Sequence, residues 1–302
     1  MKAMVLLVGE QPVPNLLPVL HERPDEVLLV HTQRTKNQND RLFNLLEGRC
    51  RREMLEVSAY DVAGTREILG KWMADKGWRT SQTIFNLTGG TKTMAFAAYE
   101  LAVRLGSEFL YLQTEGARSL IYRYITSGGA PVLRDAAEEI GPLLTIDDYV
   151  RAHLGTYTVT GFSPTEGGQF EKAVYDALRP VLDESVAGVQ LGGAVDIDMV
   201  FRCGNQVGIA ELKTGKPSKE GIGQLTTAGG RAYLGTYTKR FLIVGRSWEG
   251  FDDLKDLAIA REITLIELTG YQNTGVLSSE GVHILRQQIG EALRCSQLGS
   301  LA

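Results

Sequence analysis

The chain has 302 residues, a net charge of −4 and 43% hydrophobic residues. This length predicts one large or two medium domains, and the hydrophobic content is sufficient for a packed core. The negative charge argues against a protein that coats nucleic acid over its whole surface, so any polyanion site is expected to be local. No apolar run approaches the roughly 20 residues of a membrane span, and MVLLV near the start is shorter than a signal-peptide core. We therefore expect a cytoplasmic protein that does not bind membranes.

The cysteines and histidines are scattered along the chain. Cys50, Cys203 and Cys295 lie far apart in the sequence, which predicts neither a disulfide framework nor a zinc knuckle and fits a reducing cytoplasm. The four histidines show no metal-ligand spacing, so a histidine-based metal site or catalytic triad has no support in the sequence.

The first part of the chain alternates short apolar runs with helical patterns. Strands are predicted at residues 4–9, 26–31, 54–57, 83–87 and 108–113, and helices at 15–21, 39–47, 64–74 and 93–105. This alternation implies a parallel, doubly wound sheet of Rossmann-like type. Residues 119–126 are predicted to add a strand through a hairpin.

The run NLTGGTKTM, residues 86–94, follows a predicted strand and opens a predicted helix. Two glycines allow close backbone approach there, and the helix N-terminus favours an anion. The run also supplies hydroxyl donors and one positive charge, and its candidate ligand-binding residues are Thr88, Gly89, Gly90, Thr91 and Lys92. The spacing is not that of a P-loop.

Two more polar loops, residues 9–12 and 32–36, follow parallel strands at the same sheet edge. Ligands of open α/β sheets bind at the carboxyl ends of the strands. The three loops together favour a nucleotide-like ligand that carries phosphate. The alternative is a glycine-rich turn that binds nothing.

Gly128-Gly129 and Gly141-Pro142 interrupt the pattern and predict a domain boundary, with domains at 1–143 and 144–302. A helix at 145–154 is predicted to begin with a capping box and to connect the two parts. The second part reads as a helix (166–182), a β-hairpin, a helix (219–233) and a strand (240–244). A helix, a strand and a C-terminal helix (281–295) follow.

The most informative segment is AVDIDMVFRCGNQVGIAELKTG, residues 194–215. Two runs of alternating polar and apolar residues flank Gly204-Asn205, a pair expected of a tight hairpin turn. Cys203 then faces Gln206, and counting outward places Asp198 directly opposite Glu211.

The two faces of this hairpin differ sharply. One face carries the apolar residues Ile197, Met199, Phe201, Ala210 and Leu212, and the other carries Asp196, Asp198, Glu211 and Lys213. Directly opposed like charges are destabilising, so a carboxylate pair there requires a cation. Mg²⁺ takes oxygen ligands, commonly one or two carboxylates plus substrate phosphate. The alternative is a solvated face with a surface ion pair between Asp196 and Lys213.

A basic stretch follows the hairpin. Residues 212–246 contain seven lysines and arginines: Lys213, Lys216, Lys219, Arg231, Lys239, Arg240 and Arg246. Lysines beside a metal site would offset the backbone charge of a nucleic acid. A basic face that is merely solvated is about as plausible for this stretch alone.

These motifs together resemble the two-domain effector nucleases of type III CRISPR defence. In that family a CRISPR-associated Rossmann-fold (CARF) sensor precedes a restriction-endonuclease-like PD-(D/E)XK nuclease domain. The segments that carry the resemblance are residues 8–18, 86–94 and 167–175 and the D…ExK hairpin.

The resemblance implies a site for cyclic oligoadenylate across a two-fold homodimer of sensor domains. Cyclic tetra-adenylate is the favoured activator because a four-fold ring suits a two-fold site, with hexa-adenylate as the alternative. The residues implied are Gln11, Thr88, Gly89, Gly90, Thr91 and Lys92, with Thr35 and Lys36 as further candidates.

In the second domain the resemblance implies Glu171, Asp198 and Glu211 as ligands of Mg²⁺ or Mn²⁺ and Lys213 as the ExK lysine. Gln224 is placed like a helix glutamine of some relatives. The implied activity is hydrolysis of phosphodiesters in DNA, RNA or both, with metal-dependent activation of water and charge stabilisation by Lys213.

Three alternative functions remain from the sequence. The first is a ligand-responsive transcriptional regulator without nuclease activity, although its usual winged helix does not suit the order of elements after residue 161. The second is a dinucleotide-dependent enzyme, which the GEQPVPN turn at residues 9–15 does not favour because it lacks G-x-G-x-x-G. The third is a constitutive repair nuclease.

Overall fold

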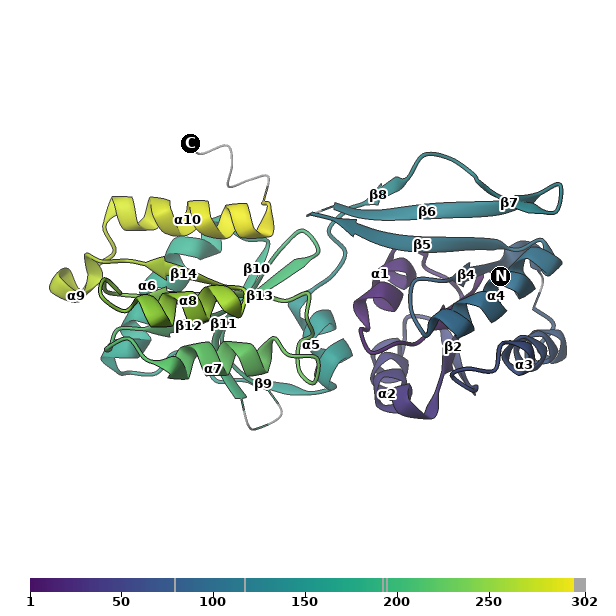
Figure 1. The fold of residues 1–302 in the computed structure, drawn as a ribbon, viewed down its shortest axis with the longest axis horizontal. Helices are drawn as coiled ribbons and strands as arrows, with labels where there is room; N and C mark the ends of the chain where they lie inside the picture. The colour runs from purple at the N-terminus through teal and green to yellow at the C-terminus, as the bar shows by residue number, and fades with distance from the viewer. Residues whose placement is uncertain (79, 117, 192, 194, 296–302) are drawn as a thin grey trace. The chain divides into compact units, whose positions relative to one another are not determined.

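The computed structural model describes residues 1–78, 80–116, 118–191, 193 and 195–295 (Figure 1). Ala194, the first residue of the predicted hairpin segment, lies outside this set. The chain divides into two compact units, Met1–Leu144 and Thr145–Ala302, and this division falls one residue after the predicted boundary. Among the described residues, none of the helices has the length and apolar character that a membrane crossing requires.

The first unit is built on an eight-stranded sheet in the order β3-β2-β1-β4-β5-β6-β7, with β8 paired to β6. The strands are β1 (Ala3–Leu7), β2 (Glu26–His31), β3 (Arg51–Glu56), β4 (Thr83–Asn86), β5 (Glu108–Glu115), β6 (Arg118–Ser127), β7 (Ala130–Leu133) and β8 (Glu138–Ile140). Strands β1 to β5 are parallel, which confirms the predicted doubly wound sheet. The hairpin strand β6 also agrees with the prediction, because it pairs antiparallel to β5.

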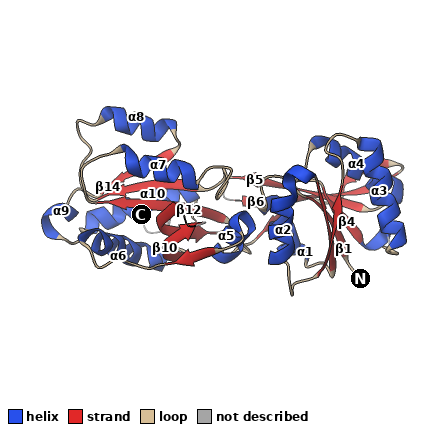
Figure 2. Ribbon diagram, turned by 90° about the horizontal axis from the view of Figure 1, so that it is seen from below, coloured by secondary structure: helices blue, strands red, loops and turns tan. Residues whose placement is uncertain are grey.

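Helices cover both faces of this sheet (Figure 2). They are α1 (Val13–Glu22), α2 (Lys36–Leu45), α3 (Val62–Asp75) and α4 (Lys92–Leu105). Side chains of α3 and α4 pack on Val5, Leu7 and Phe85 of the central strands, which are fully buried. The carboxyl ends of β1, β2 and β4 all lead into loops at one sheet edge, where the predicted ligand-binding residues lie.

The second unit contains a six-stranded mixed sheet in the order β14-β13-β12-β11-β10-β9. Its strands are β9 (Tyr157–Val159), β10 (Glu184–Leu191), β11 (Val195–Cys203), β12 (Gln206–Lys213), β13 (Lys239–Val244) and β14 (Ile263–Glu267). β11 and β12 form the predicted antiparallel hairpin, and β12, β13 and β14 run parallel.

The helices of the second unit are α5 (Ile146–Leu154), α6 (Glu166–Leu178), α7 (Lys219–Ala228), α8 (Asp252–Ala260), α9 (Tyr271–Thr274) and α10 (Ser279–Leu293). α6 and α10 share one hydrophobic core with the apolar face of the hairpin, including Met199, Phe201 and Leu212. α7 contacts β11, β12 and β13. A Cβ at Gly221 of α7 would lie 3.4 Å from Glu211, so α7 covers the charged face of the hairpin.

Two helix ends were predicted four or five residues too late in the chain. The helix predicted over 166–182 ends at Leu178, and a single 3₁₀ turn (Arg179–Val181) follows because Pro180 cannot continue an α-helix. The helix predicted over 219–233 ends at Ala228, where the Gly229-Gly230 pair begins.

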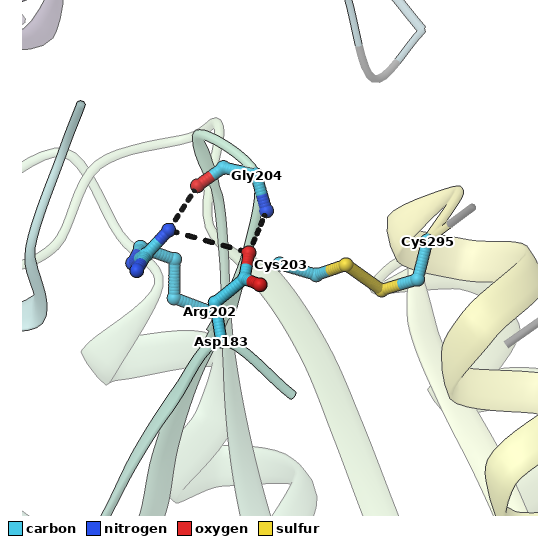
Figure 3. Close-up of a disulfide and its surroundings, with 5 residues drawn as sticks. All are labelled: Asp183, Arg202, Cys203, Gly204 and Cys295. Carbon is cyan, nitrogen blue, oxygen red and sulfur yellow. Dashed lines mark hydrogen bonds and ion pairs between the residues drawn. A yellow bond between two sulfur atoms is a disulfide. The ribbon is translucent and has the colours of Figure 1, made fainter. Parts of the chain in front are cut away.

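The prediction of no disulfide is wrong for one pair of cysteines. Cys203 and Cys295 form a disulfide with a Cα–Cα distance of 5.8 Å, within the usual range (Figure 3). The two residues are 92 positions apart, but the last residue of β11 and the second residue past the end of α10 meet at the same core. Cys50 is a free thiol.

Candidate functional site

The hairpin places Asp198 and Glu211 at neighbouring positions of β11 and β12. The paired register runs from Cys203↔Gln206 at the turn to Met199↔Ala210. Asp198 and Glu211 are the next residues of the two strands beyond this last pair. The Leu212 N–H donates a hydrogen bond of 2.6 Å to Asp198 Oδ2. This bond draws the Asp198 carboxylate against β12, on which both Glu211 and Lys213 lie.

Glu211 is the most deeply buried acid of this group, with 1% of its surface exposed. Its Oε1 atom lies 2.6 Å from Lys213 Nζ. Its Oε2 atom is buried and has no hydrogen-bond partner among the described residues. Burying an unpaired carboxylate oxygen is costly, so this atom indicates a cation or donor that the protein side chains do not supply.

The pKa shifts of the acidic cluster also indicate a missing cation. Burial, and then the charge of Asp198, raises the pKa of Glu211 to about 8. Burial also raises the pKa of Asp198 and the pKa of Glu171, and the charge of Asp198 adds to the rise at Glu171. Burial lowers the pKa of Lys213, but its bond to Glu211 outweighs this and the pKa of Lys213 is raised. The carboxylates therefore repel one another across a poorly solvated space.

Helix α7 covers the space around these carboxylates, and the residue of α7 that lies against them is a glycine, Gly221. A Cβ at Gly221 would lie 3.4 Å from Glu211 Cγ and 3.9 Å from Lys213 Cε, so the helix backbone passes close to both side chains. Gln224 follows three residues later, close to one helical turn. The Oε1 atom of Gln224 is buried and also has no hydrogen-bond partner among the described residues.

A divalent cation fits these residues. Three carboxylates and one ammonium leave two negative charges uncompensated, and the unpartnered oxygens of Glu211 and Gln224 are the hard donors that Mg²⁺ or Mn²⁺ prefers. In the described part of the chain no three His, Cys, Asp or Glu residues form a group that could hold a metal. The fit of a cation therefore rests on Asp198 and Glu211. Glu171 is close enough for the charge of Asp198 to raise its pKa.

The cations of the predicted basic stretch differ in their pairing and exposure. Arg240 pairs with Glu262 at 3.0 Å, so its charge is partly compensated. Lys216 and Lys219 are exposed in the segment that follows β12. Arg246 follows β13 directly, and the Gly245 N–H bonds to the Lys213 carbonyl at 2.9 Å. Lys216 and Arg246 thus lie just beyond the carboxyl ends of two neighbouring parallel strands, β12 and β13.

In the first unit, the two glycines of the run 86–94 make close backbone contacts. A Cβ at Gly89 would lie 2.1 Å from the carbonyl oxygen of Leu7. Gly90 has a φ of +71°, and a Cβ there would lie 2.8 Å from Leu7 Cβ. The loops after β1 and β4 consequently approach each other more closely than any other residue type would allow.

The threonine hydroxyls of this run are occupied within the protein. Thr88 donates to Asn86 Oδ1 at 2.7 Å and accepts from the Leu112 N–H at 2.7 Å. Thr91 caps α4 by accepting from the Met94 N–H and also donates to the carbonyl of Ala59. These two side chains hold the loop in place, whereas Lys92 is exposed at the start of α4.

The other predicted ligand-binding residues differ from one another in burial and in their bonds. Thr35 is buried and its hydroxyl completes a capping box with Thr32. Lys36 forms an ion pair of 3.5 Å with Asp40 on α2. Gln11 is half-buried in the loop after β1. The neighbouring Arg34, which the sequence did not single out, is highly exposed and bonds to Glu10 at 2.6 Å.

A hollow of about 560 Å³ lies at the carboxyl ends of β2 and β3. It is lined by Thr32, Gln33, Arg34, Glu56, Val57, Ser58, Ala59, Tyr60 and Ile68. Hydrogen bonds of Thr91 and Thr93 to the Ala59 carbonyl fasten its wall to the start of α4. One feature of the sequence could have indicated this hollow: Tyr60, in the loop that follows the strand β3.

Comparison with known proteins bears first on the N-terminal half. Residues 3–149 match the family described as the Card1 CARF domain. The first unit is CARF-like. No curated protein matches the chain.

Three solved structures resemble nearly the whole chain. The structure of Can2 from Sulfobacillus thermosulfidooxidans in complex with cyclic tetra-adenylate has 18% identity and a TM-score of 0.73, and the match covers 97% of this chain and 99% of Can2. Protein VC1899 from Vibrio cholerae has 12% identity and a TM-score of 0.70 over 97% and 98% of the two chains.

The third is a type III CRISPR defence DNA nuclease activated by cyclic oligoadenylate, with 17% identity and a TM-score of 0.63. That match covers 98% of this chain but 52% of the nuclease, so the present chain spans about half of its length. At these identities the likenesses show a shared two-unit α/β fold.

Proposed function

We propose that this protein is a metal-dependent nuclease that cyclic oligoadenylate activates through the CARF-like unit. The observation that carries the proposal is the buried Glu211 carboxylate, whose Oε2 atom is unpartnered among the described residues while Asp198 and Lys213 adjoin it. The CARF family match and the likeness to a nuclease activated by cyclic oligoadenylate support this choice.

Asp198, Glu211 and Glu171 would hold Mg²⁺ or Mn²⁺. When bound, such an ion acts as a Lewis acid toward phosphate oxygens and activates water for hydrolysis. The Leu212 N–H fixes the Asp198 carboxylate, and Lys213 fixes one oxygen of Glu211, so both acids are oriented before substrate arrives. The Gln224 Oε1 atom, which has no hydrogen-bond partner among the described residues, would accept a hydrogen bond from water that enters the covered space.

Lys213 supplies the positive charge of this arrangement. Its side chain is 36% exposed, so the ammonium group can contact both the buried Glu211 and an incoming phosphate. The exposed Lys216 and Lys219 and the half-buried Arg246 would contact the backbone of a bound nucleic acid on either side of the scissile bond. The substrate in this proposal is DNA, RNA or both, because backbone contacts do not distinguish bases.

The activator in this proposal is cyclic tetra-adenylate, bound at the loops that follow β1, β2 and β4 of two chains in a homodimer. Lys92 and Gln11 would contact it, and the backbone at Gly89 and Gly90 would approach its phosphates. Thr88 and Thr91 shape the loop because their hydroxyls bond within the protein.

The direct test is a cleavage assay with the full-length protein. Supercoiled plasmid, labelled single-stranded DNA and labelled RNA are each incubated with Mn²⁺ or Mg²⁺, with and without cyclic tetra-adenylate. We expect cleavage that requires both the ion and the activator. The Glu211→Gln and Lys213→Met variants should each lose at least about 100-fold in rate, because one loses a carboxylate of the metal site and the other the charge that stabilises the transition state.

A matched control is Asp176→Asn, which removes an exposed acid of α6 that pairs with Lys172 and should leave the rate unchanged. Undiminished cleavage by both cluster variants would contradict the nuclease proposal. Binding of DNA without cleavage under every condition would instead favour the ligand-responsive regulator.

A further inference from the structure

We propose that Tyr149 is a positioning residue of the acidic cluster, because its hydroxyl connects α5, the first helix of the second unit, to the end of α7. The inference rests on the proposed function and adds to it a route by which activator binding would reach the buried carboxylates. α5 begins at Ile146, the second residue of the second unit. A displacement of the chain where the first unit ends is therefore passed to α5 through the covalent chain.

The Tyr149 side chain is buried, and its hydroxyl has two partners outside α5. Tyr149 is 3% exposed. Its hydroxyl donates to the Leu234 carbonyl at 2.9 Å and lies 2.7 Å from the Thr238 hydroxyl. Both partners belong to the segment between α7 and β13. A phenylalanine would fill the same space without a polar group, so the specific contribution of the hydroxyl is this connection between α5 and that segment.

The segment that Tyr149 contacts is itself bonded to the end of α7. The Leu234 N–H donates at 2.9 Å to the carbonyl of Ala228, the last residue of α7. Leu234 is fully buried, so water does not compete for these backbone groups. Two successive hydrogen bonds, from Tyr149 to Leu234 and from Leu234 to Ala228, thus lead from α5 to the C-terminal end of α7.

The start of α5 is bonded to the sheet that carries the cluster. The Ile146 N–H donates to Glu184 Oε2 of β10 at 2.8 Å, and the same oxygen accepts from Arg202 Nε of β11 at 3.3 Å. β11 is also the strand of Asp198. α5 is therefore connected both to the strand that bears one acid of the cluster and to the helix that covers the other.

α7 lies close enough to the cluster for its position to affect the carboxylates. A Cβ at Gly221 would lie 3.4 Å from Glu211 Cγ. Ala228 and Gly221 lie about two turns apart on the same helix. Packed helices shift as units, so a displacement of the C-terminal end of α7 changes the space between Gly221 and Glu211. Through this contact the Tyr149 hydroxyl acts on the cluster without touching it.

The test is hydrogen exchange of the α7 amides in the full-length protein. Exchange is measured with Mn²⁺ present, with and without saturating cyclic tetra-adenylate. In the wild-type protein the activator should change the exchange rates of α7 by at least about fivefold, because both ligands favour one state. Tyr149→Phe should reduce this change to within about twofold of none, while calorimetry gives a dissociation constant for cyclic tetra-adenylate within about threefold of wild type.

Two matched variants separate the connection to α7 from the loss of a hydroxyl. Tyr157→Phe removes a tyrosine hydroxyl that bonds at 3.1 Å to Asp147 of the same helix α5. Thr238→Val removes the second hydroxyl at Tyr149 but leaves the bond from Tyr149 to Leu234. Both variants should retain the response of α7 to the activator. A tyrosine that only stabilises the fold would not distinguish Tyr149→Phe from Thr238→Val, since each loses one buried hydroxyl.

Cleavage of plasmid with Mn²⁺ and saturating activator gives a second measurement. Tyr149→Phe should lower the rate at least about fivefold, and the two matched variants should stay within about twofold of wild type. A wild-type rate and a wild-type exchange response in Tyr149→Phe would overturn the inference and leave the proposed function intact. Equal losses in Tyr149→Phe and Thr238→Val would also overturn it.

Failure of the proposed function has a different signature. If the wild-type protein binds cyclic tetra-adenylate but cleaves no nucleic acid, the exchange measurement still applies. A response of α7 that Tyr149→Phe alone abolishes would then support the route from α5 to α7 although the nuclease proposal fails. Absence of any response of α7 in the wild-type protein, or of activator binding, would overturn the inference.

Discussion

Two buried carboxylates of this chain have opposite surroundings. Glu22 of α1 is 8% exposed and bonds to Lys2 at 2.6 Å and to Arg123 of β6. Burial raises the pKa of Glu22, but the bonds and charges of Lys2 and Arg123 outweigh it, so its pKa is lowered overall. Glu211 has one ammonium partner and a second acid nearby, and its pKa is raised. A compensated acid stabilises the fold, whereas an uncompensated one is suited to bind a cation.

The compensated acid leads to a prediction about stability and pH. Glu22→Gln should lower the free energy of unfolding of the CARF-like unit by about 2–3 kcal/mol at pH 7, because a buried guanidinium loses its charged partner. A lowered native pKa contributes stability above the unfolded pKa of about 4.3, and this contribution is lost as pH falls through the native pKa. The difference in unfolding free energy between the wild-type protein and the variant should therefore narrow as the pH falls below about 4.3, as urea unfolding at about pH 7, 5 and 3 would measure.

The matched control is Glu53→Gln, which removes an exposed acid that pairs with Lys76 in the same unit. Exposed pairs contribute about 1 kcal/mol or less, so this variant should change little at any of the three pH values. A free-energy difference for Glu22→Gln that stays constant down to about pH 3 would contradict the assignment of its stabilisation to the ionised carboxylate.

At the scale of elements, the loop after β4 makes a close backbone approach to the end of β1. Gly89→Ala would place a Cβ 2.1 Å from the Leu7 carbonyl oxygen, which belongs to a central strand and has no free space to move into. We expect a loss of about 1–3 kcal/mol in the stability of the CARF-like unit, together with weaker binding of cyclic tetra-adenylate. Thermal unfolding and calorimetry would measure the two effects.

Gly141→Ala is the matched control, because a Cβ at Gly141 meets no atom within 4 Å. Equal stability of the two variants would show that the loops can separate without cost. That result would remove the structural reason for glycine at position 89.

Local sequence patterns predicted much of the fold and of the acidic cluster. The Gly204-Asn205 turn fixed the hairpin register because a two-residue turn leaves one pairing of its neighbours, and Cys203↔Gln206 is observed. Strand β10 was not predicted, since Gly188 interrupts its apolar alternation. In the structure Gly188 has a φ of +60°, and a Cβ there would lie 2.2 Å from the Gly161 carbonyl, a contact that only the folded sheet creates.

Features that depend on distant segments could not be predicted in this way. The disulfide between Cys203 and Cys295 requires the hairpin turn to meet the end of α10. The burial of Glu211 depends on α7, which returns over the charged face after the chain has left the hairpin. The hairpin pattern alone indicated which residues carry charge but not that Glu211 would be only 1% exposed.

At the scale of the whole molecule, the proposed activator site and the acidic cluster belong to different compact units. Activation is then a coupling free energy between two sites, and coupling in binding is reciprocal. If cyclic tetra-adenylate tightens the binding of nucleic acid by some factor, nucleic acid must tighten the binding of cyclic tetra-adenylate by the same factor. Typical couplings of this kind amount to about 5–150-fold.

This reciprocity yields a prediction that does not depend on turnover. In the Lys213→Met variant, which keeps Glu171, Asp198 and Glu211, both dissociation constants are measured with Mn²⁺ present, each with and without a saturating amount of the other ligand. We expect both to fall at least about fivefold, and by equal factors within error, because each ligand favours the same state of the protein. If both constants stay unchanged while cyclic tetra-adenylate still activates cleavage by the wild-type protein, the activator does not act on substrate binding. Its effect would then lie on the chemical step, on the orientation of the buried acids and Lys213 relative to a substrate already bound.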